Sequence, residues 1–89
     1  MIVRIQGEGQ YDLEGDAIHQ LKVADARLFD AVAGGAGEAF AREFAAVLTL
    51  VREQGRRLGP TELRESDLVL PAGDTTLEEA RKLFTSHPT

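Results

Sequence analysis

The chain has 89 residues, no cysteine and a formal net charge of −5. The length fits one domain, and the lack of cysteine excludes disulfide bonds, thiolate metal sites and cysteine nucleophiles. The acidic balance argues against sequence-independent nucleic-acid binding, which needs a basic face, and against direct docking on an anionic membrane. No apolar run approaches the roughly 20 residues that span a bilayer, and residues 1–9 do not resemble a signal peptide.

The N-terminal segment predicts a short β-hairpin. Residues 1–6 alternate between two faces and are rich in β-branched side chains, which is typical of a strand. Gly7 and Gly9 interrupt this pattern, and a second extended run from Tyr11 to Glu14 follows. The two glycines resemble the start of a dinucleotide-binding motif. Because a strand follows them where that motif needs a helix, we interpret them as turn residues.

Two amphipathic helices are predicted over residues 16–33 and 38–53, where apolar residues recur at spacings of four and three. The first is expected to begin with Asp16 as its N-cap. Its apolar positions are Ala17, Ile18, Leu21, Ala24, Leu28, Phe29, Ala31 and Val32. Those of the second, which should supply much of the core, are Phe40, Phe44, Val47, Leu48 and Val51. The short glycine-rich link between them predicts an antiparallel helix pair.

The remaining segments are shorter. Residues 61–66 fit either one helical turn or a loop, and residues 68–70 fit either a third strand or an extended cover on the core. A last helix is expected to begin at Thr75 or Thr76, because each has a glutamate three residues later. Its apolar positions are Leu77, Ala80, Leu83 and Phe84. The whole chain, residues 1–89, therefore predicts a single α+β domain. It is predominantly helical, with a short N-terminal β-hairpin, an antiparallel helix pair, a short extended segment and a C-terminal helix.

One partner-binding surface is suggested by the residues alone. Arg52, Arg56 and Arg57 form the main basic concentration and could meet acidic residues or phosphates of a partner. The same arginines also fit ordinary favourable placement of cations at a helix C-terminus. Val23 lies on the polar side of the first predicted helix, where an apolar side chain is either a partner contact or a single exposed residue.

A metal site is the second candidate. Asp12, Glu14, Asp16 and His19 supply oxygen ligands and one imidazole, but their spacing matches no known metal-binding loop. A solvated edge beside a capped helix is the simpler interpretation of these residues. No arrangement of serine, histidine and acid suggests nucleophilic catalysis, so we expect a protein that is not an enzyme and needs no cofactor.

Two segments resemble the PspA-associated protein family, PspAA, of actinobacteria and archaea. The resemblance rests on MIVRI and GEGQY at residues 1–5 and 7–11, and on SDLVLP, an aspartate and TLEE at residues 66–71, 74 and 76–79. It covers essentially the whole chain. It implies a largely three-helix, non-enzymatic partner of PspA, the coiled-coil membrane-remodelling protein of the phage-shock response to envelope stress in bacteria. No catalytic or ligand residues are carried over from the family.

The function expected from this resemblance is an adaptor that binds PspA, or a PspA-like coiled-coil protein, and modulates its assembly. Such a protein would be cytoplasmic and peripheral to the inner face of the membrane through PspA, with self-association left open. Two alternatives from other classes remain: a small acidic transcriptional or antitoxin-like regulator, and a divalent-metal or ligand-binding module built on Asp12, Glu14, Asp16 and His19.

Overall fold

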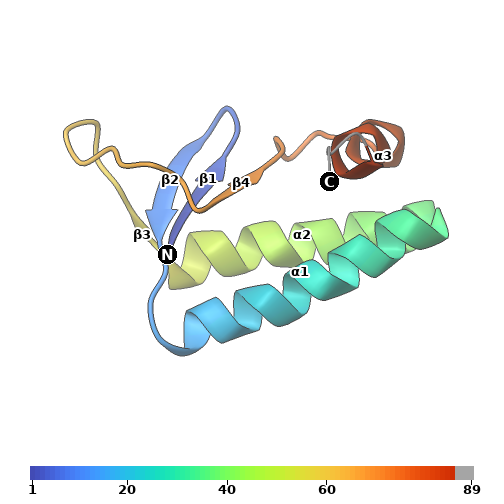
Figure 1. Cartoon of the computed structure of the whole chain (residues 1–89), viewed down its shortest axis with the longest axis horizontal. Helices are drawn as coiled ribbons and strands as arrows, with labels where there is room; N and C mark the ends of the chain where they lie inside the picture. Colours follow the sequence, from blue (N-terminus) through green and yellow to red (C-terminus); the bar gives the residue numbers. More distant parts are fainter. Residues whose placement is uncertain (86–89) are drawn as a thin grey trace.

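The fold joins a small sheet to a pair of long helices. The computed structural model describes residues 1–85, without the side chains of Arg81, Leu83, Phe84 and Thr85. In this part of the chain, a four-stranded sheet and a short helix lie along one side of two long helices (Figure 1). The elements are β1 (Ile2–Ile5), β2 (Gly9–Asp12), α1 (Asp16–Gly34), α2 (Gly37–Gln54), β3 (Arg56–Arg57), β4 (Leu68–Leu70) and α3 (Leu77–Thr85). The predicted α+β class is confirmed.

The sheet has the strand order β3-β2-β1-β4. β1 pairs antiparallel with β2, which places Val3 opposite Tyr11, and parallel with β4, which places Val3 opposite Leu68. Residues 68–70 are therefore a strand, which decides between the two alternatives that the sequence left open. β2 begins at Gly9, two residues before the predicted strand. β3 pairs antiparallel with β2 and was not predicted.

The core lies between the sheet and the helix pair. Side chains alternate between the two faces of a strand, and those of Val3, Ile5 and Leu70 turn toward the helices, where each is at most 2% exposed. The residues that α2 buries are the five predicted ones: Phe40, Phe44, Val47, Leu48 and Val51. The rings of Phe40 and Phe44 stack with centroids 5.3 Å apart. The period of α2 thus identified the central packing surface correctly.

Two predictions for α1 are wrong. Phe29 was assigned to the apolar stripe but is 54% exposed, because it follows the buried Leu28 by about 100° around the helix. Asp16 was expected to cap the helix but is its first residue. The N-cap is Gly15, whose φ of 61° is in the left-handed region and which makes no side-chain capping bond.

The other helix ends follow their sequence signals. Gly35 ends α1 in the left-handed conformation, and its N–H donates to the carbonyl of Val32. α3 begins with the expected capping box: the Glu79 N–H donates to Thr76 Oγ1 at 3.2 Å, and the Thr76 N–H donates to Glu79 Oε1 at 3.1 Å. Ala80 is fully buried. The side chains of Leu83 and Phe84, also predicted to be apolar contacts, lie outside the described part of the structure.

The connection between β3 and β4, residues 58–67, crosses the face of the sheet that points away from the helices; we call it the crossing loop. Gln10, on that face, is only 3% exposed. Its Nε2 donates to the carbonyl of Arg64 and to Ser66 Oγ, and its Oε1 accepts from the Arg64 N–H at 3.1 Å. These bonds hold the loop down, so residues 61–66 form a loop and not a helical turn.

Candidate functional site

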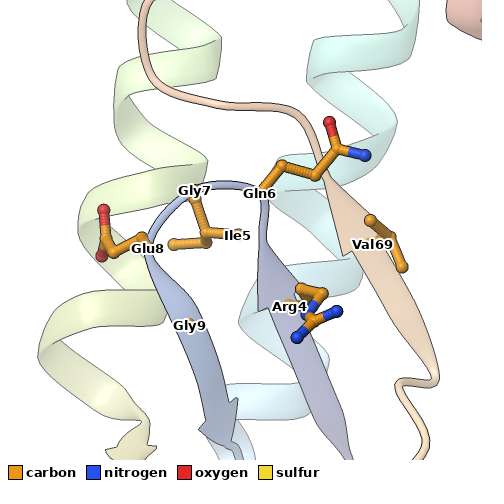
Figure 2. A pocket seen from close by; sticks show the side chains of 7 residues that line it. All are labelled: Arg4, Ile5, Gln6, Gly7, Glu8, Gly9 and Val69. Carbon is orange, nitrogen blue, oxygen red and sulfur yellow. The ribbon is translucent and has the colours of Figure 1, made fainter.

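A polar cluster gathers at the turn of the β1–β2 hairpin. Gly7, with φ of 79°, and Gly9, with φ of 150°, adopt backbone conformations that favour glycine, and they flank Glu8. The Glu8 side chain points toward α2 (Figure 2). There its carboxylate is bound by Arg52: Nε donates to Oε2 at 2.9 Å and to Oε1 at 3.1 Å, and Nη2 donates to Oε1 at 2.6 Å. This bidentate geometry is the strongest form of an arginine–carboxylate pair.

Two further side chains complete this Glu8 cluster, which consists of Glu8, Tyr11, Arg52 and Arg57. The Tyr11 hydroxyl donates to Glu8 Oε2 at 2.7 Å. Arg57 Nη2 donates to the main-chain carbonyl of Glu8 at 2.8 Å. The cluster therefore ties the hairpin turn to the end of α2 and to β3, which lie 44 and 49 positions further along the chain.

The protonation states in the cluster follow from these contacts. The hydrogen bond from Arg52, followed by that from Tyr11, lowers the pKa of Glu8 to about 2. The same carboxylate raises the pKa of Tyr11 because it accepts the hydrogen bond from the protonated Tyr11 hydroxyl, and burial raises this pKa further. Glu8 also raises the pKa of Arg52. A carboxylate that stays ionised to such low pH has no proton to exchange near neutrality, so the arrangement suits a structural link and not acid–base catalysis.

The structure brings some of the predicted partner-binding residues together. Arg52 and Arg57 meet at Glu8, whereas Arg56 pairs with Glu62 at 2.9 Å on the exposed side of β3. Val23 is on α1 and is 41% exposed. Each of the three arginines therefore has an acceptor within its own chain. Glu8 was not predicted as the acceptor of Arg52 and Arg57, because in the sequence it reads only as part of a glycine-rich turn.

The residues considered for a metal site are spread over β2, a loop and α1. Within residues 1–85, no group of three or more histidine, aspartate or glutamate side chains is arranged to hold a metal ion. Asp12 lies 3.6 Å from the amino group of Met1. The structure therefore gives no support to a metal module built on Asp12, Glu14, Asp16 and His19.

The two sequence segments that carry the family resemblance meet in space. Gln10 of the first segment binds Ser66 of the second at 2.9 Å, and the Ile2 N–H donates to Asp67 Oδ2 at 2.8 Å. β1 of the first segment pairs with β4 of the second. The residues Gly7 to Tyr11 thus have structural tasks: two shape the turn, two build the Glu8 cluster and one holds the crossing loop.

An open depression of about 730 Å³ lies on the outer side of the hairpin turn, lined by Arg4, Ile5, Gln6, Gly7, Glu8, Gly9 and Val69 (Figure 2). Its polar groups do not converge on one point, since Glu8 is directed toward α2 while Arg4 lies beside Val69. This shape fits a surface for a macromolecular contact better than an enclosed small-molecule pocket.

The fold and the Glu8 cluster together define a small α+β protein. Its polar cluster links the hairpin turn to α2 and β3 and so has a structural role. The whole chain except its last residue matches the family model for PspA-Associated protein, PspAA, over residues 1–88. The protein therefore belongs to the PspA-associated protein family. Comparison with curated proteins and with solved structures gave no match.

Proposed function

We propose that the protein is a non-enzymatic adaptor that binds PspA and modulates its assembly in the envelope stress response. The observation that carries this proposal is the family match over residues 1–88, because the family is named for its association with PspA. The Glu8 cluster is consistent with a non-enzymatic role, since its low-pKa carboxylate is fully engaged by donors of the same chain.

The proposed contact surface is the side of the helix pair that the sheet and α3 leave uncovered within the described residues (Figure 1). A coiled-coil partner presents long helices, and helices pack best along other helices. Val23 lies exposed on α1, and Arg56 lies exposed where α2 leads into the sheet. Arg52 and Arg57, which we also predicted as partner contacts, would reach a partner only by sharing or giving up their bonds to Glu8.

The membrane enters this proposal only through the partner. No helix within residues 1–85 is long and apolar enough to cross a bilayer, and the chain carries a net charge of −5. As part of the proposed partnership with PspA, we propose that the protein is cytoplasmic and is recruited to the membrane surface by PspA.

The test is co-expression with PspA of the same organism, followed by affinity capture and size-exclusion chromatography. We expect co-elution, and we expect Val23→Glu to weaken it because the substitution puts a charge into a helix–helix contact. Arg56→Glu tests whether the partner also contacts the exposed arginine where α2 leads into β3. Arg52 and Arg57 are poor probes, since their reversal would also break the Glu8 cluster.

Leu63→Glu is the matched control. Leu63 is 60% exposed on the crossing loop, away from the helix pair, and should tolerate the same new charge without effect on co-elution. If the control and Val23→Glu behave alike, the contact surface lies elsewhere. If the unaltered protein never co-elutes with PspA, even with anionic vesicles present, the adaptor function is refuted.

A further inference from the structure

β4 is an edge of the sheet, and the main chain of one of its residues faces outward. The Leu70 carbonyl accepts from the Gln6 N–H at 2.9 Å, so the main chain of Leu70 faces β1. Peptide groups alternate in direction along a strand, so the N–H and carbonyl of Val69 face the open edge. Within residues 1–85, these two groups have no hydrogen bond beyond the sheet. They can therefore pair with an added strand.

The outer face beside this edge carries a cation. Arg4 sits directly opposite Val69 in the β1–β4 pairing, and its side chain lies next to that of Val69 in Figure 2. The Arg4 side chain is exposed and forms no ion pair with any residue that the structure describes. Val69 is 50% exposed. An exposed arginine beside an open strand edge favours an acidic ligand at that point, against the background of a negative net charge.

We propose that β4 and Arg4 form a docking site for an extended segment of a partner protein that carries one central acidic residue. The segment adds to β4 as an antiparallel strand and forms two main-chain hydrogen bonds with Val69. Its residue opposite Val69 points to the outer face, about 10 Å from β1 at two strand spacings. A glutamate there extends over Val69 and meets the Arg4 guanidinium. This site is separate from the helix-pair surface and does not depend on PspA being the ligand.

The neighbouring residues restrict what the segment can carry. Asp67 is exposed two residues before Val69 and disfavours a second acid at the position opposite it. Pro71, two residues after Val69, has no N–H to donate. The site therefore selects a short segment with one central acidic residue and not a polyacidic one.

The experiment is a titration of the full-length, isotope-labelled chain with a capped heptapeptide of alternating valine and threonine that has one central glutamate. Amide resonances are followed by nuclear magnetic resonance. We expect shifts at Leu68, Val69 and Leu70, and weaker binding as salt is raised. A peptide with lysine in place of the glutamate should bind less well.

Two variants separate the two halves of the site. Arg4→Gln should weaken binding about three- to fivefold, which is typical of an exposed ion pair. Arg27→Gln, at an exposed arginine of α1, is its matched control and should change nothing. Val69→Pro removes the outward N–H but no bond of the sheet, so it should abolish binding while the thermal unfolding midpoint stays close to that of the parent.

The proposal is overturned if the lysine peptide binds as well as the glutamate peptide, or if Val69→Pro binds normally. It is also overturned if the shifts fall on the helix pair. Shifts of the β4 amides that appear on concentrating the protein without peptide would mean that the edge pairs with a second copy, which likewise contradicts it.

Discussion

Glu8, in the hairpin turn, forms hydrogen bonds with three residues that lie on β2, α2 and β3. Its side chain binds Arg52 and Tyr11, and its main-chain carbonyl binds Arg57. Because its side chain is 26% exposed, these bonds are partly screened by solvent, and their net contribution is smaller than the pKa of about 2 alone would suggest. We expect about 1 kcal/mol from the charged pair.

Glu8→Gln should therefore lower the free energy of unfolding by about 1 kcal/mol at neutral pH. The pKa of Glu8 is lowered in the folded chain, from 4.5 to about 2, so its contribution is present above pH 4.5 and is lost as the pH falls toward 2. The stability difference between parent and variant should thus shrink over this range in urea unfolding followed by circular dichroism. Glu53→Gln, at an exposed position of α2, is the control. A difference that does not change with pH would contradict the assigned pKa.

Gly55 allows the end of α2 to approach β2 closely. A Cβ atom at this position would lie 2.6 Å from the Val51 carbonyl oxygen and 2.9 Å from both Leu13 Cδ1 and Tyr11 Cβ. We expect Gly55→Ala to destabilise the protein by about 1–3 kcal/mol, because the backbone has to shift.

Gly34→Ala provides the comparison. A Cβ atom at Gly34, in the last turn of α1, has no neighbour within 4 Å, so this substitution should be neutral or stabilise by up to about 1 kcal/mol. Both variants are measured by thermal unfolding. Equal effects at the two positions would show that close packing at Gly55 is not what requires a glycine.

Among the elements, those with a periodic sequence were predictable and those that depend on distant pairing were not. The apolar stripe of α2 and the capping box at Thr76 are local patterns, and both are confirmed. β3 is two arginines long and has no period. It becomes a strand only because Arg57 pairs with Tyr11, which lies 46 positions earlier in the chain. No local pattern encodes such a long-range pairing.

The candidate site shows the same division. The cluster of arginines could be recognised in the sequence. No local pattern indicated that Glu8, in a glycine-rich turn, would bind two of them. Phe29 was assigned to the buried stripe because its type and spacing allowed it, although the narrower stripe around Leu28 suffices to pack against α2. Which cations bind within the chain is decided by tertiary geometry, which spacing alone does not contain.

The middle of the crossing loop is held by the buried side-chain amide of Gln10. Gln10→Ala removes the bonds to Arg64 and Ser66 and should destabilise the protein by about 1–3 kcal/mol. We also expect faster cleavage after Arg64 by trypsin, because the loop would no longer be held against the sheet. Gln6→Ala is the control, because Gln6 is an exposed residue of the same hairpin, directly after β1. Unchanged stability and cleavage would mean that Leu58 and the neighbouring backbone suffice to fix the loop.

For the molecule as a whole, the net charge determines its electrostatic interaction with a membrane surface. A net charge of −5 repels an anionic lipid surface. We expect no co-sedimentation of the protein with phosphatidylglycerol vesicles at low salt, and co-sedimentation only when PspA is added. Neutral phosphatidylcholine vesicles are the control for trapping in the pellet. Sedimentation of the protein alone with the anionic vesicles would contradict indirect recruitment.

The placement of β1 between β2 and β4 has a consequence for biosynthesis. The Ile2 N–H finds its acceptor on Asp67, 65 positions later. At about 5–20 residues per second, a ribosome takes roughly 3–13 s to make that stretch. During this interval the edge of β1 that later pairs with β4 has no partner. The apolar side chains of β1 are not yet covered by the complete fold. The earliest-made strand is thus among the last to be completed, so we expect its edge and its apolar side chains to stay exposed for most of synthesis.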